Sequence, residues 1–387
     1  MKNLNVGKRL AKKIKSGVDL IDSRDVENLK NLPDQDYARL FEGKNFLGIA
    51  YFSKQNKGAG WLINRRDELP DLTFWLNLFT KAKSRRSRYY EDTTTNAFRL
   101  FNQDGDGFGG LTIDLYKDYA VFSWYNSFVY NHKDEILAAF KEIFPEVLGA
   151  YEKLRFKEAE FESAHLYGQK EEDKFLIQEN GVNYSVFLND GLMTGIFLDQ
   201  HDVRDLLISG LACGKTVLNT FSYTAAFSLA AMAGGAIESV SVDLAKRSRE
   251  LSEDNFKANN FNLDNNKFVV MDIFEYFKYA KRHNLKFDVI VLDPPSFARN
   301  KKQTFSVAKD YHKLISQSLD ILSNQGMIIA STNAQNLSLD KFKEQIDLGM
   351  NGQGYTIEQT LSLPEDFRYN HKDKSSDYLK VNIIKVN

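Results

Sequence analysis

The run Val291 to Arg299, VLDPPSFAR, places an aspartate, two prolines and a phenylalanine directly after an apolar stretch. Each proline fixes its φ angle at about −65° and lacks an N–H group, and the first also pushes Asp293 toward an extended backbone. We therefore predict a rigid loop that holds the Asp293 carboxylate against a planar, hydrogen-bonding ligand, with Phe297 offering a stacking surface. The alternative is a plain surface turn with Phe297 packed in the core beneath it.

Three earlier apolar runs also end in polar residues. The first ends in Asn219, Thr220, Phe221, Ser222 and Tyr223, the second in Asp243 and the third in Asp272. Asp243 follows Asn219 by about 24 residues, close to the spacing at which a carboxylate binds ribose in dinucleotide-binding folds. A single aspartate at such a place is more often an N-cap than a ligand-binding residue. Polar side chains at four successive strand ends, however, predict a ligand site.

The elements that would position these residues alternate between strand-like and helix-like patterns. Strands are expected at TVLNTF, ESVSVD, FVVMD, FDVIVLD and GMIIAS. Helices should begin at about Thr224, Ala245 and Phe274, and two more are expected, one before Leu322 and one near Leu339. Such alternation predicts an α/β fold with a mostly parallel, doubly wound, Rossmann-like sheet. The last runs, TIEQTLSL and DYLKVNIIKV, would add an antiparallel edge. Ligands bind such sheets at the carboxyl ends of the strands, where the strand order reverses.

The sequence as a whole is expected to form three domains. Residues 1–71 contain short β-like runs (GVDLID, YARLF and FLGIAYF) and predict a small β-rich module. Residues 72–174 mix helical and strand patterns and predict a central α+β domain. The third domain, residues 175–387, opens with LIQENGVNYSVFL, in which Asn180-Gly181 favours a type I′ hairpin. A helix should follow at about Asp199 to Ser209.

The composition of the 387-residue chain limits its possible functions. Cys213 is the only cysteine, which excludes a disulfide framework and a thiolate zinc site, and the six histidines lack metal-ligand spacing. No run approaches the roughly 18 consecutive apolar residues of a membrane span. We expect a cytoplasmic protein with no membrane or metal partner. The oligomeric state is left open, with a homodimer as one option.

The formal net charge is −1, but basic residues gather in two runs, the second beside a pair of tyrosines. The two runs contribute Lys12, Lys13, Lys15, Arg85, Arg86 and Arg88. Cations beside aromatic rings suit phosphate neutralisation and base stacking, so both runs are candidate RNA-binding segments. A solvated protein surface is the alternative interpretation of either run.

The first turn lacks the GxGxxG pattern with which a backbone approaches a pyrophosphate, and this argues against NAD. GLACGKT, Gly210 to Thr216, resembles a phosphate-binding loop, but it precedes its strand and has three residues between its glycines instead of four. An adenosine with a charged, phosphate-free tail fits better. Its ribose would lie at Asp243, its adenine amine near Asp272 and its amino acid tail near the first turn. That ligand is S-adenosylmethionine.

Five segments resemble, in order, the motifs of class I S-adenosylmethionine-dependent RNA methyltransferases. They are GLMTGIFLDQHDVR, VLNTFSYTAAFSLAAMAGGA, SVDLA, the DxF at Asp272 and LDPPSFAR. The chain is similar to the large-subunit rRNA (cytosine-5) methyltransferases that carry an N-terminal PUA domain, and the first module resembles a degenerate PUA domain. The resemblance implies S-adenosylmethionine as the cofactor and RNA, specifically rRNA, as the partner.

The same resemblance implies which side chains line the cofactor site. They are Gln200, Asn219, Phe221, Ser222, Tyr223, Asp243, Leu244, Asp272, Ile273 and Asp293. Arg204 would either hold the methionine carboxylate or form a structural ion pair.

One departure from the family pattern changes the expected chemistry. Cytosine C5 is a weak nucleophile, so enzymes that methylate it first add a cysteine thiolate to C6. In the relatives that cysteine follows the fifth strand, where this chain reads IIASTNAQNLS, Ile328 to Ser338. The other cysteine position known in such enzymes, after the paired prolines, is Ser296 here. Cys213 precedes the first strand and is expected at the opposite edge of the sheet.

The segments around DPPSFAR and ASTNAQNLS look more like enzymes that methylate a guanine ring nitrogen of large-subunit rRNA. Such a nitrogen has a lone pair and needs no covalent intermediate, so alignment with the methyl donor supplies most of the rate enhancement. Asp293 would position the base, Phe297 would stack on it and Asn333 would bond its edge, unless Asn333 caps the following helix. Two other functions stay open: 5-methylcytosine formation through an atypical nucleophile, and a noncatalytic RNA-binding assembly factor.

Overall fold

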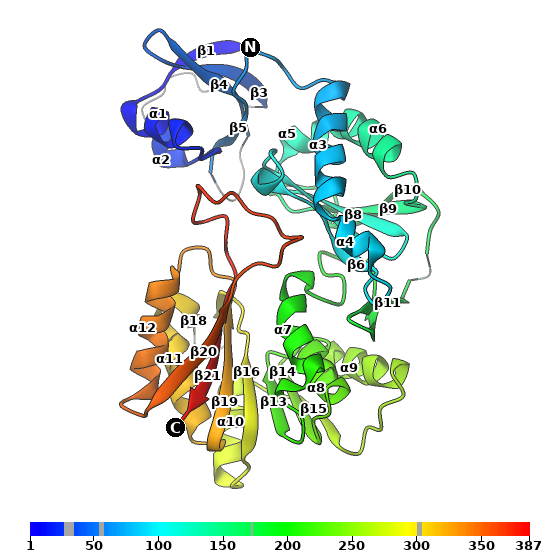
Figure 1. Ribbon diagram of the computed structural model, residues 1–387, viewed down its shortest axis with the longest axis vertical. Coiled ribbons are helices and arrows are strands. Elements are labelled where there is room, and N and C mark those ends of the chain that lie inside the picture. Colours follow the sequence, from blue (N-terminus) through cyan, green and yellow to red (C-terminus); the bar gives the residue numbers. More distant parts are fainter. Residues whose placement is uncertain (27–34, 54–57, 172, 300–303) are drawn as a thin grey trace. The chain divides into compact units, whose positions relative to one another are not determined.

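The computed structural model describes residues 1–26, 35–53, 58–171, 173–299 and 304–387 (Figure 1). The chain forms two compact units. The first unit comprises residues 1–177, 187–194 and 365–376, and the second comprises residues 178–186, 195–364 and 377–387. Both predicted N-terminal domains lie in the first unit, so the three-domain division remains a prediction.

The first unit begins with a five-stranded sheet in the order β1-β3-β4-β5-β2. Its strands are β1 (Lys2–Asn5), β2 (Leu20–Ile21), β3 (Asp36–Glu42), β4 (Asn45–Phe52) and β5 (Gly60–Asn64), with helices α1 (Lys8–Lys15) and α2 (Ser23–Val26). The β1–β3 pair is parallel, and the β3–β4, β4–β5 and β2–β5 pairs are antiparallel. The β-rich module predicted from the sequence is thus present.

A second five-stranded sheet of the first unit has the order β10-β9-β8-β7-β6. Its elements are α3 (Leu72–Arg85), α4 (Ser87–Glu91), β6 (Ala97–Asn102), η1 (Gln103–Gly105), β7 (Leu111–Tyr116), β8 (Tyr119–Trp124), α5 (Ser127–Asn131), α6 (Lys133–Ile143), β9 (Gly149–Leu154) and β10 (Ser163–Gly168). Tyr51 and Trp61 of the first sheet share one buried core with Trp75, Phe79 and Phe122. The two parts of this unit are therefore packed together.

The second unit is built on a seven-stranded sheet in the order β15-β14-β13-β16-β19-β21-β20 (Figure 1). The strands are β13 (Thr216–Thr220), β14 (Glu238–Asp243), β15 (Asn266–Val270), β16 (Phe287–Leu292), β19 (Leu322–Thr332), β20 (Tyr355–Leu361) and β21 (Lys380–Val386). The first five are parallel and β21 pairs antiparallel with both of its neighbours. The predicted doubly wound sheet with an antiparallel edge is confirmed, and the strand order reverses between β13 and β16.

Helices follow the strands as the sequence pattern predicts. They are α7 (His201–Leu206), α8 (Ala226–Ala233), α9 (Lys246–Ala258), α10 (Ile273–Arg282), α11 (Val307–Leu319) and α12 (Leu339–Met350), with short turns η2 (Leu198–Gln200) and η3 (Leu207–Leu211) beside α7. Leu218, Ile290 and Ile328 pack in one core with side chains of α10, α11 and α12. Because successive side chains of a strand point to opposite faces, Asn219 lies on the other face of the sheet.

Two hairpins differ in how well the sequence predicted them. Strands β11 (Phe175–Glu179) and β12 (Val182–Val186) form the predicted hairpin, and both turn residues have positive φ, 51° at Asn180 and 78° at Gly181. A type I′ turn requires this geometry. A second pair, β17 (Phe297–Arg299) and β18 (Thr304–Ser306), follows the paired prolines and was not predicted. Three-residue strands are too short to show a period-two pattern.

No helix among the described residues has the length and apolar character needed to cross a membrane.

Candidate cofactor and substrate site

The loop after β13 is held in an unusual backbone conformation. Phe221, Tyr223 and Ala225 have φ angles of 53°, 48° and 60°. Each such non-glycine conformation costs on the order of 1–3 kcal/mol and persists only where neighbouring contacts enforce it. Here the Ser222 N–H donates to the Val242 carbonyl at 3.1 Å, and the Tyr223 hydroxyl accepts the Gly195 N–H at 3.1 Å. The loop is therefore shaped in advance at the carboxyl end of the central strand.

Asp243, at the end of β14, connects this loop to the next helix. Its Oδ2 accepts the Tyr223 N–H and its Oδ1 accepts the Ala245 N–H, each at 2.8 Å. A carboxylate has about four acceptor positions, so these two bonds fix its orientation and leave it able to accept hydroxyl groups. The following residue, Leu244, is 61% exposed and offers an apolar surface beside the carboxylate.

Among the buried amides of the described residues, Asn219 and Gln200 have polar atoms without a protein partner. Neither the Oδ1 nor the Nδ2 of Asn219 is bonded, although the side chain is fully buried at the end of β13. Gln200 donates its Nε2 to Ser331 Oγ at 2.8 Å and to Asp293 Oδ1 at 3.3 Å, while its Oε1 is unpartnered. A buried, unsatisfied polar group costs about 1–3 kcal/mol. These amide atoms are therefore suited to bonds with a bound ligand.

The DPPS loop is fixed from beneath by two buried hydroxyl groups. Tyr311 donates to the Leu292 carbonyl at 2.9 Å and Thr220 donates to the Val291 carbonyl at 2.8 Å. The pKa of Asp293 is raised to about 6, chiefly because the carboxyl group is buried; the hydrogen bond from Ser331 opposes this increase and the negative charge of Asp199 contributes to it. Carboxylates with a strongly raised pKa are concentrated at functional sites, so Asp293 is a candidate for a functional role.

Ser296 and Asn333 join the DPPS loop to the loop after β19. The Ser296 hydroxyl donates to Asn333 Oδ1 at 2.8 Å. Asn333 does not cap the next helix, because Ser338 is the N-cap of α12 and accepts the Lys341 N–H. Phe297 is 62% exposed, so the alternative that placed it in the core beneath the loop is wrong. The structure thus places Asp293, Phe297 and Asn333 at the same edge of the sheet.

Residues 154–365, more than half of the chain, match a family model described as S-adenosylmethionine-dependent methyltransferase. The chain belongs to the S-adenosylmethionine-dependent methyltransferases. Residues 4–65 of the methyltransferase match a second model, described as a PUA-like domain.

Two curated relatives are similar over most of their length. The "Putative ribosomal RNA large subunit methyltransferase YwbD" of Bacillus subtilis (strain 168) is 42% identical over 393 residues, covering 99% of each chain. Ribosomal RNA large subunit methyltransferase I of Aeromonas salmonicida (strain A449) is 32% identical over 282 residues, covering 72% of this chain and 70% of the relative. Among solved structures, SMU.776 complexed with SAH is 57% identical, with a TM-score of 0.96 and full coverage of both chains.

Two residues assigned to the cofactor site make structural contacts in the methyltransferase. Asp272 is the N-cap of α10 and accepts the Phe274 N–H at 3.0 Å and the Glu275 N–H at 3.4 Å. Its neighbour Ile273 is 5% exposed and packs in the hydrophobic core. Asp272 therefore has the N-cap role that the sequence left as an alternative, and this role fixes its carboxylate at the end of β15.

Arg204 forms a buried ion pair instead of facing the cofactor site. Arg204 is 1% exposed, and its guanidinium forms a bidentate ion pair with Glu179, with Nε–Oε1 at 2.6 Å and Nη2–Oε2 at 2.7 Å. It also donates to the Phe197 carbonyl at 2.9 Å. The alternative of a structural ion pair is thus the one observed, and we no longer assign Arg204 to the methionine carboxylate.

Several basic residues predicted to bind RNA have protein partners in the first unit. Arg86 is 1% exposed and donates to Asp106 and to the Asp366 carbonyl, so its assignment to RNA binding is wrong. Ion pairs are also formed by Lys13 with Asp22 and Asp25, by Lys15 with Glu42, by Arg85 with Asp106 and by Arg88 with Glu365. Lys12 is exposed on α1. The side chains of Lys13, Lys15, Arg85 and Arg88 stay partly exposed in these ion pairs, so RNA binding by them and by Lys12 remains a prediction.

Cys213 lies at the amino edge of the sheet, as predicted. It is exposed in the turn between η3 and β13, and its N–H donates to the Gly210 carbonyl at 3.0 Å. The glycine-rich turn therefore precedes its strand and cannot cradle a ligand at the carboxyl edge. Among the described residues, no group of three or more His, Cys, Asp and Glu side chains is arranged to hold a metal ion.

Three further residues, which the sequence did not identify, are candidates for the site: Asp199, Tyr378 and Lys380. Tyr378 donates its hydroxyl to Asp199 Oδ2 at 2.9 Å. Lys380 is buried and donates to the carbonyls of Ala334 and Tyr378 at 3.1 and 3.0 Å, and burial lowers its pKa. Because β21 runs antiparallel to β19, it begins at the edge where the parallel strands end. The position of Tyr378 and Lys380 at the start of a strand predicted to be antiparallel could therefore have placed them at this edge of the sheet.

Proposed function

We propose that this methyltransferase methylates a base of large-subunit rRNA, and that the target is a guanine ring nitrogen, such as N7, reached by direct transfer. The names of the two curated relatives support the rRNA substrate. The position of the single cysteine supports a ring nitrogen as the methylated atom. Cys213 lies at the amino edge of the sheet, whereas the loops at the carboxyl edge carry the hydroxyl of Ser296 and the amide of Asn333.

Ser296 is a poor replacement for a catalytic thiol. A serine attacks only when an adjacent base removes its proton. The observed partner of the Ser296 hydroxyl is the amide oxygen of Asn333, which cannot act as such a base. A covalent bond to cytosine C6 is therefore unsupported at this position, whereas a guanine ring nitrogen already has the lone pair that the transfer needs.

The cofactor is S-adenosylmethionine, which supplies, when bound, a methyl group activated on a sulfonium. We assign the ribose hydroxyls to Asp243, whose carboxylate is already oriented by two backbone N–H groups. Asp272 marks the position of the adenine amine. The unpartnered amides of Asn219 and Gln200 offer both donors and acceptors to the rest of the cofactor. Phe221, Ser222, Tyr223 and Leu244 complete the surface around it.

We assign the substrate base to the side of the DPPS loop that faces away from the cofactor. The ionised Asp293 carboxylate accepts N–H groups of the guanine, and the Asn333 NH2 group donates to its O6. Phe297 provides the exposed ring on which the base stacks. The protein contributes alignment and exclusion of water, which together supply a large part of the rate enhancement in reactions of this kind.

The test is a transfer assay with radiolabelled cofactor and unmodified large-subunit rRNA, followed by digestion to nucleosides. Label in methylguanosine supports the proposal and label in 5-methylcytidine contradicts it. Cys213→Ser is the matched variant, because unchanged activity removes the only thiol from the mechanism. Calorimetry with S-adenosylmethionine and with its demethylated product tests the noncatalytic alternative, which an absence of binding of both would favour. The reaction is assigned to the cytoplasm, and light scattering of the purified protein determines whether it acts as a homodimer.

A further inference from the structure

Residues Glu365–Ser376, here called the strap, connect β20 to β21 but belong to the first unit. The strap is anchored there by Asp366, whose fully buried carboxylate accepts the Arg99 N–H at 2.8 Å and the Tyr89 hydroxyl at 3.3 Å. Its carbonyl accepts the buried Arg86 guanidinium at 2.6 Å. The Arg99 guanidinium lies over the Phe367 ring, with its Cζ atom 4.2 Å from the ring centroid. These buried contacts fix the strap on the first unit.

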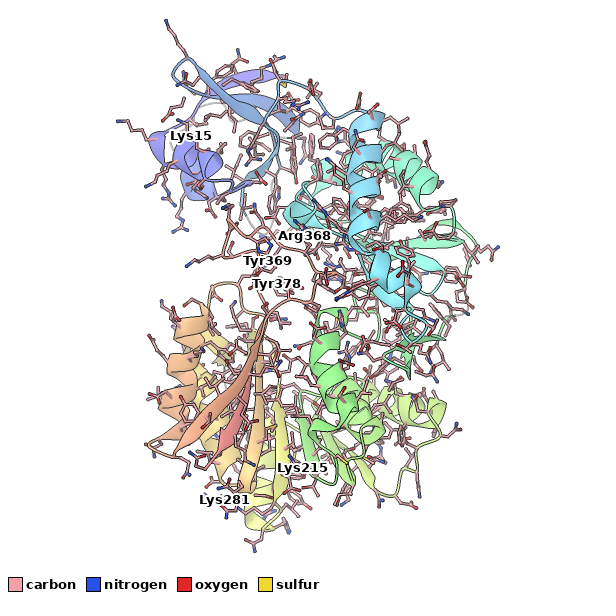
Figure 2. The ribbon with its side chains drawn as sticks, in the orientation of Figure 1. Lys15, Lys215, Lys281, Arg368, Tyr369 and Tyr378 are labelled. Atoms are coloured by element: carbon pink, nitrogen blue, oxygen red, sulfur yellow. The ribbon has the colours of Figure 1, made fainter. Side chains whose placement is uncertain are left out.

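The rest of the strap presents cations and aromatic rings at the surface. Arg368, Lys372 and Lys374 are exposed. Between them, the rings of Tyr369 and His371 are in edge contact, with centroids 4.5 Å apart (Figure 2 labels Arg368 and Tyr369). The acidic neighbour Asp373 accepts the Ser375 N–H and hydroxyl within its own turn. We call Arg368, Tyr369, His371, Lys372 and Lys374 the strap patch.

The strap patch adjoins the C-terminal end of α1, which is far away in the sequence. Asn370 donates to the Gly17 carbonyl at 2.9 Å. A Cβ atom on Gly17 would lie 2.9 Å from Lys372 Cγ, so Lys372 packs directly on this turn. The nearby Asp19 is paired with Arg65 at 2.7 Å. The strap patch therefore continues onto the PUA-like part of the first unit, which carries the exposed Lys12.

We propose that the strap patch binds a single-stranded segment of the RNA substrate. Cationic side chains bind phosphates, and aromatic side chains stack on bases that are not paired in a duplex. The strap patch offers both at adjacent positions. Arg368 donates its Nε to the Gly105 carbonyl at 3.1 Å and keeps its positive charge, whereas the charges of Arg85, Arg86 and Arg88 are paired with Asp106 or Glu365. This inference rests on the proposed function, because it assumes that the substrate is RNA.

RNA binding by the strap patch can be tested with a fluorescently labelled oligouridylate of about 15 nucleotides, whose binding is measured by fluorescence anisotropy. The triple variant Arg368→Gln/Lys372→Gln/Lys374→Gln should weaken binding at least about tenfold at roughly 0.1 M salt and reduce the slope of log Kd against log salt by about 2, since each phosphate contact to a single strand contributes about 0.7. Tyr369→Ala should weaken binding by about tenfold with no change in slope.

The matched control removes three exposed lysines of the second unit, Lys267, Lys278 and Lys281, each also changed to Gln (Figure 2 labels Lys281). This control should bind RNA as the wild type does. Unchanged binding of S-adenosylhomocysteine and an unchanged melting temperature exclude misfolding of the strap variants.

The strap inference is overturned if the triple variant keeps the affinity and salt slope of the wild type, or if a duplex RNA of about 16 base pairs binds as tightly as the oligouridylate. It is also overturned if the control variant loses as much affinity as the strap variant. The two proposals fail separately. If the wild-type enzyme does not methylate rRNA, the proposed function is refuted, even where the strap variant loses oligouridylate binding. If the wild type methylates rRNA fully and the strap variant binds RNA as the wild type does, only the strap inference is refuted.

Discussion

Replacement of Asp293 by Asn should stabilise the methyltransferase at neutral pH while removing its activity. Burial raises the pKa of Asp293 from 3.8 to about 6. A shift of this size corresponds to about 3 kcal/mol, at about 1.4 kcal/mol per pKa unit. The folded protein therefore carries an ionised carboxylate whose charge is disfavoured by its surroundings, and the hydrogen bond from Gln200 can still be accepted by an asparagine oxygen.

The sign of this effect depends on pH. Between the unfolded pKa near 3.8 and the folded pKa near 6, the folded state binds the proton more tightly than the unfolded state. The stability due to Asp293 is therefore fully present below about pH 4 and is lost as the pH rises through about 6. The Asp293→Asn variant should exceed the wild type by up to about 3 kcal/mol in free energy of unfolding above this range and should lose the advantage below it.

Thermal unfolding of both proteins across this pH range measures the difference, and a matched variant gives the opposite sign. Asp288 accepts the Thr216 N–H and hydroxyl at 2.9 and 3.0 Å, and these hydrogen bonds outweigh burial and lower its pKa. Asp288→Asn should therefore destabilise the protein at neutral pH, and the loss should shrink as the medium becomes acidic. An Asp293→Asn variant that melts below the wild type at neutral pH would show that the ionised Asp293 carboxylate does not destabilise the folded protein.

The same carboxylate should control the pH dependence of methyl transfer. Single-turnover rates should fall about tenfold per pH unit below about pH 6, as the base-binding carboxylate becomes protonated. Asp199→Asn should move this limb to lower pH, because burial still raises the Asp293 pKa but the negative charge of Asp199 no longer adds to it. An acid limb that stays in place in the Asp199 variant, or Asp293→Asn activity equal to that of the wild type, would contradict the assigned role.

Three further predictions concern single residues of the second unit. Asp243→Ala should weaken S-adenosylmethionine binding about 10- to 100-fold by calorimetry, since hydrogen bonds to a charged group contribute about 1.5–3 kcal/mol; unchanged affinity would remove the ribose assignment. Arg204→Met should lower the free energy of unfolding by about 3–5 kcal/mol in denaturant titration, because it leaves Glu179 buried and unpaired; a variant as stable as the wild type would contradict this. Tyr378→Phe should lower the transfer rate by about tenfold, with cofactor affinity retained in calorimetry, through loss of its hydrogen bond to Asp199; an unchanged rate would show that this bond does not position the site.

The sheet and its ligand edge could be predicted because parallel strands place their carboxyl ends together. Asn219, Asp243 and Asp293 are at strand ends in the sequence and at one edge of the sheet in the structure. The hairpin at Asn180-Gly181 was predictable for a similarly local reason, since both turn positions need positive φ.

The errors concern residues whose partners are distant in the chain. Arg86 looks like part of a basic surface in the sequence, but it is buried against Asp106 and against Asp366, 280 residues away. Arg204 is likewise buried by Glu179, which no local pattern connects to it. The strap carries no periodic signal that would assign Glu365–Ser376 to the first unit. Tyr378 is different, because the predicted antiparallel direction of β21 already implied its position at the site.

Direct methylation of a guanine ring nitrogen, as proposed for this enzyme, proceeds without a covalent intermediate. The most direct measurement is nucleoside analysis of unmodified large-subunit rRNA after a single incubation with labelled S-adenosylmethionine, using the wild type and Cys213→Ser in parallel. Direct transfer to a guanine ring nitrogen should give labelled methylguanosine in equal amounts from both proteins. Labelled 5-methylcytidine from the wild type, lost in Cys213→Ser, would contradict it.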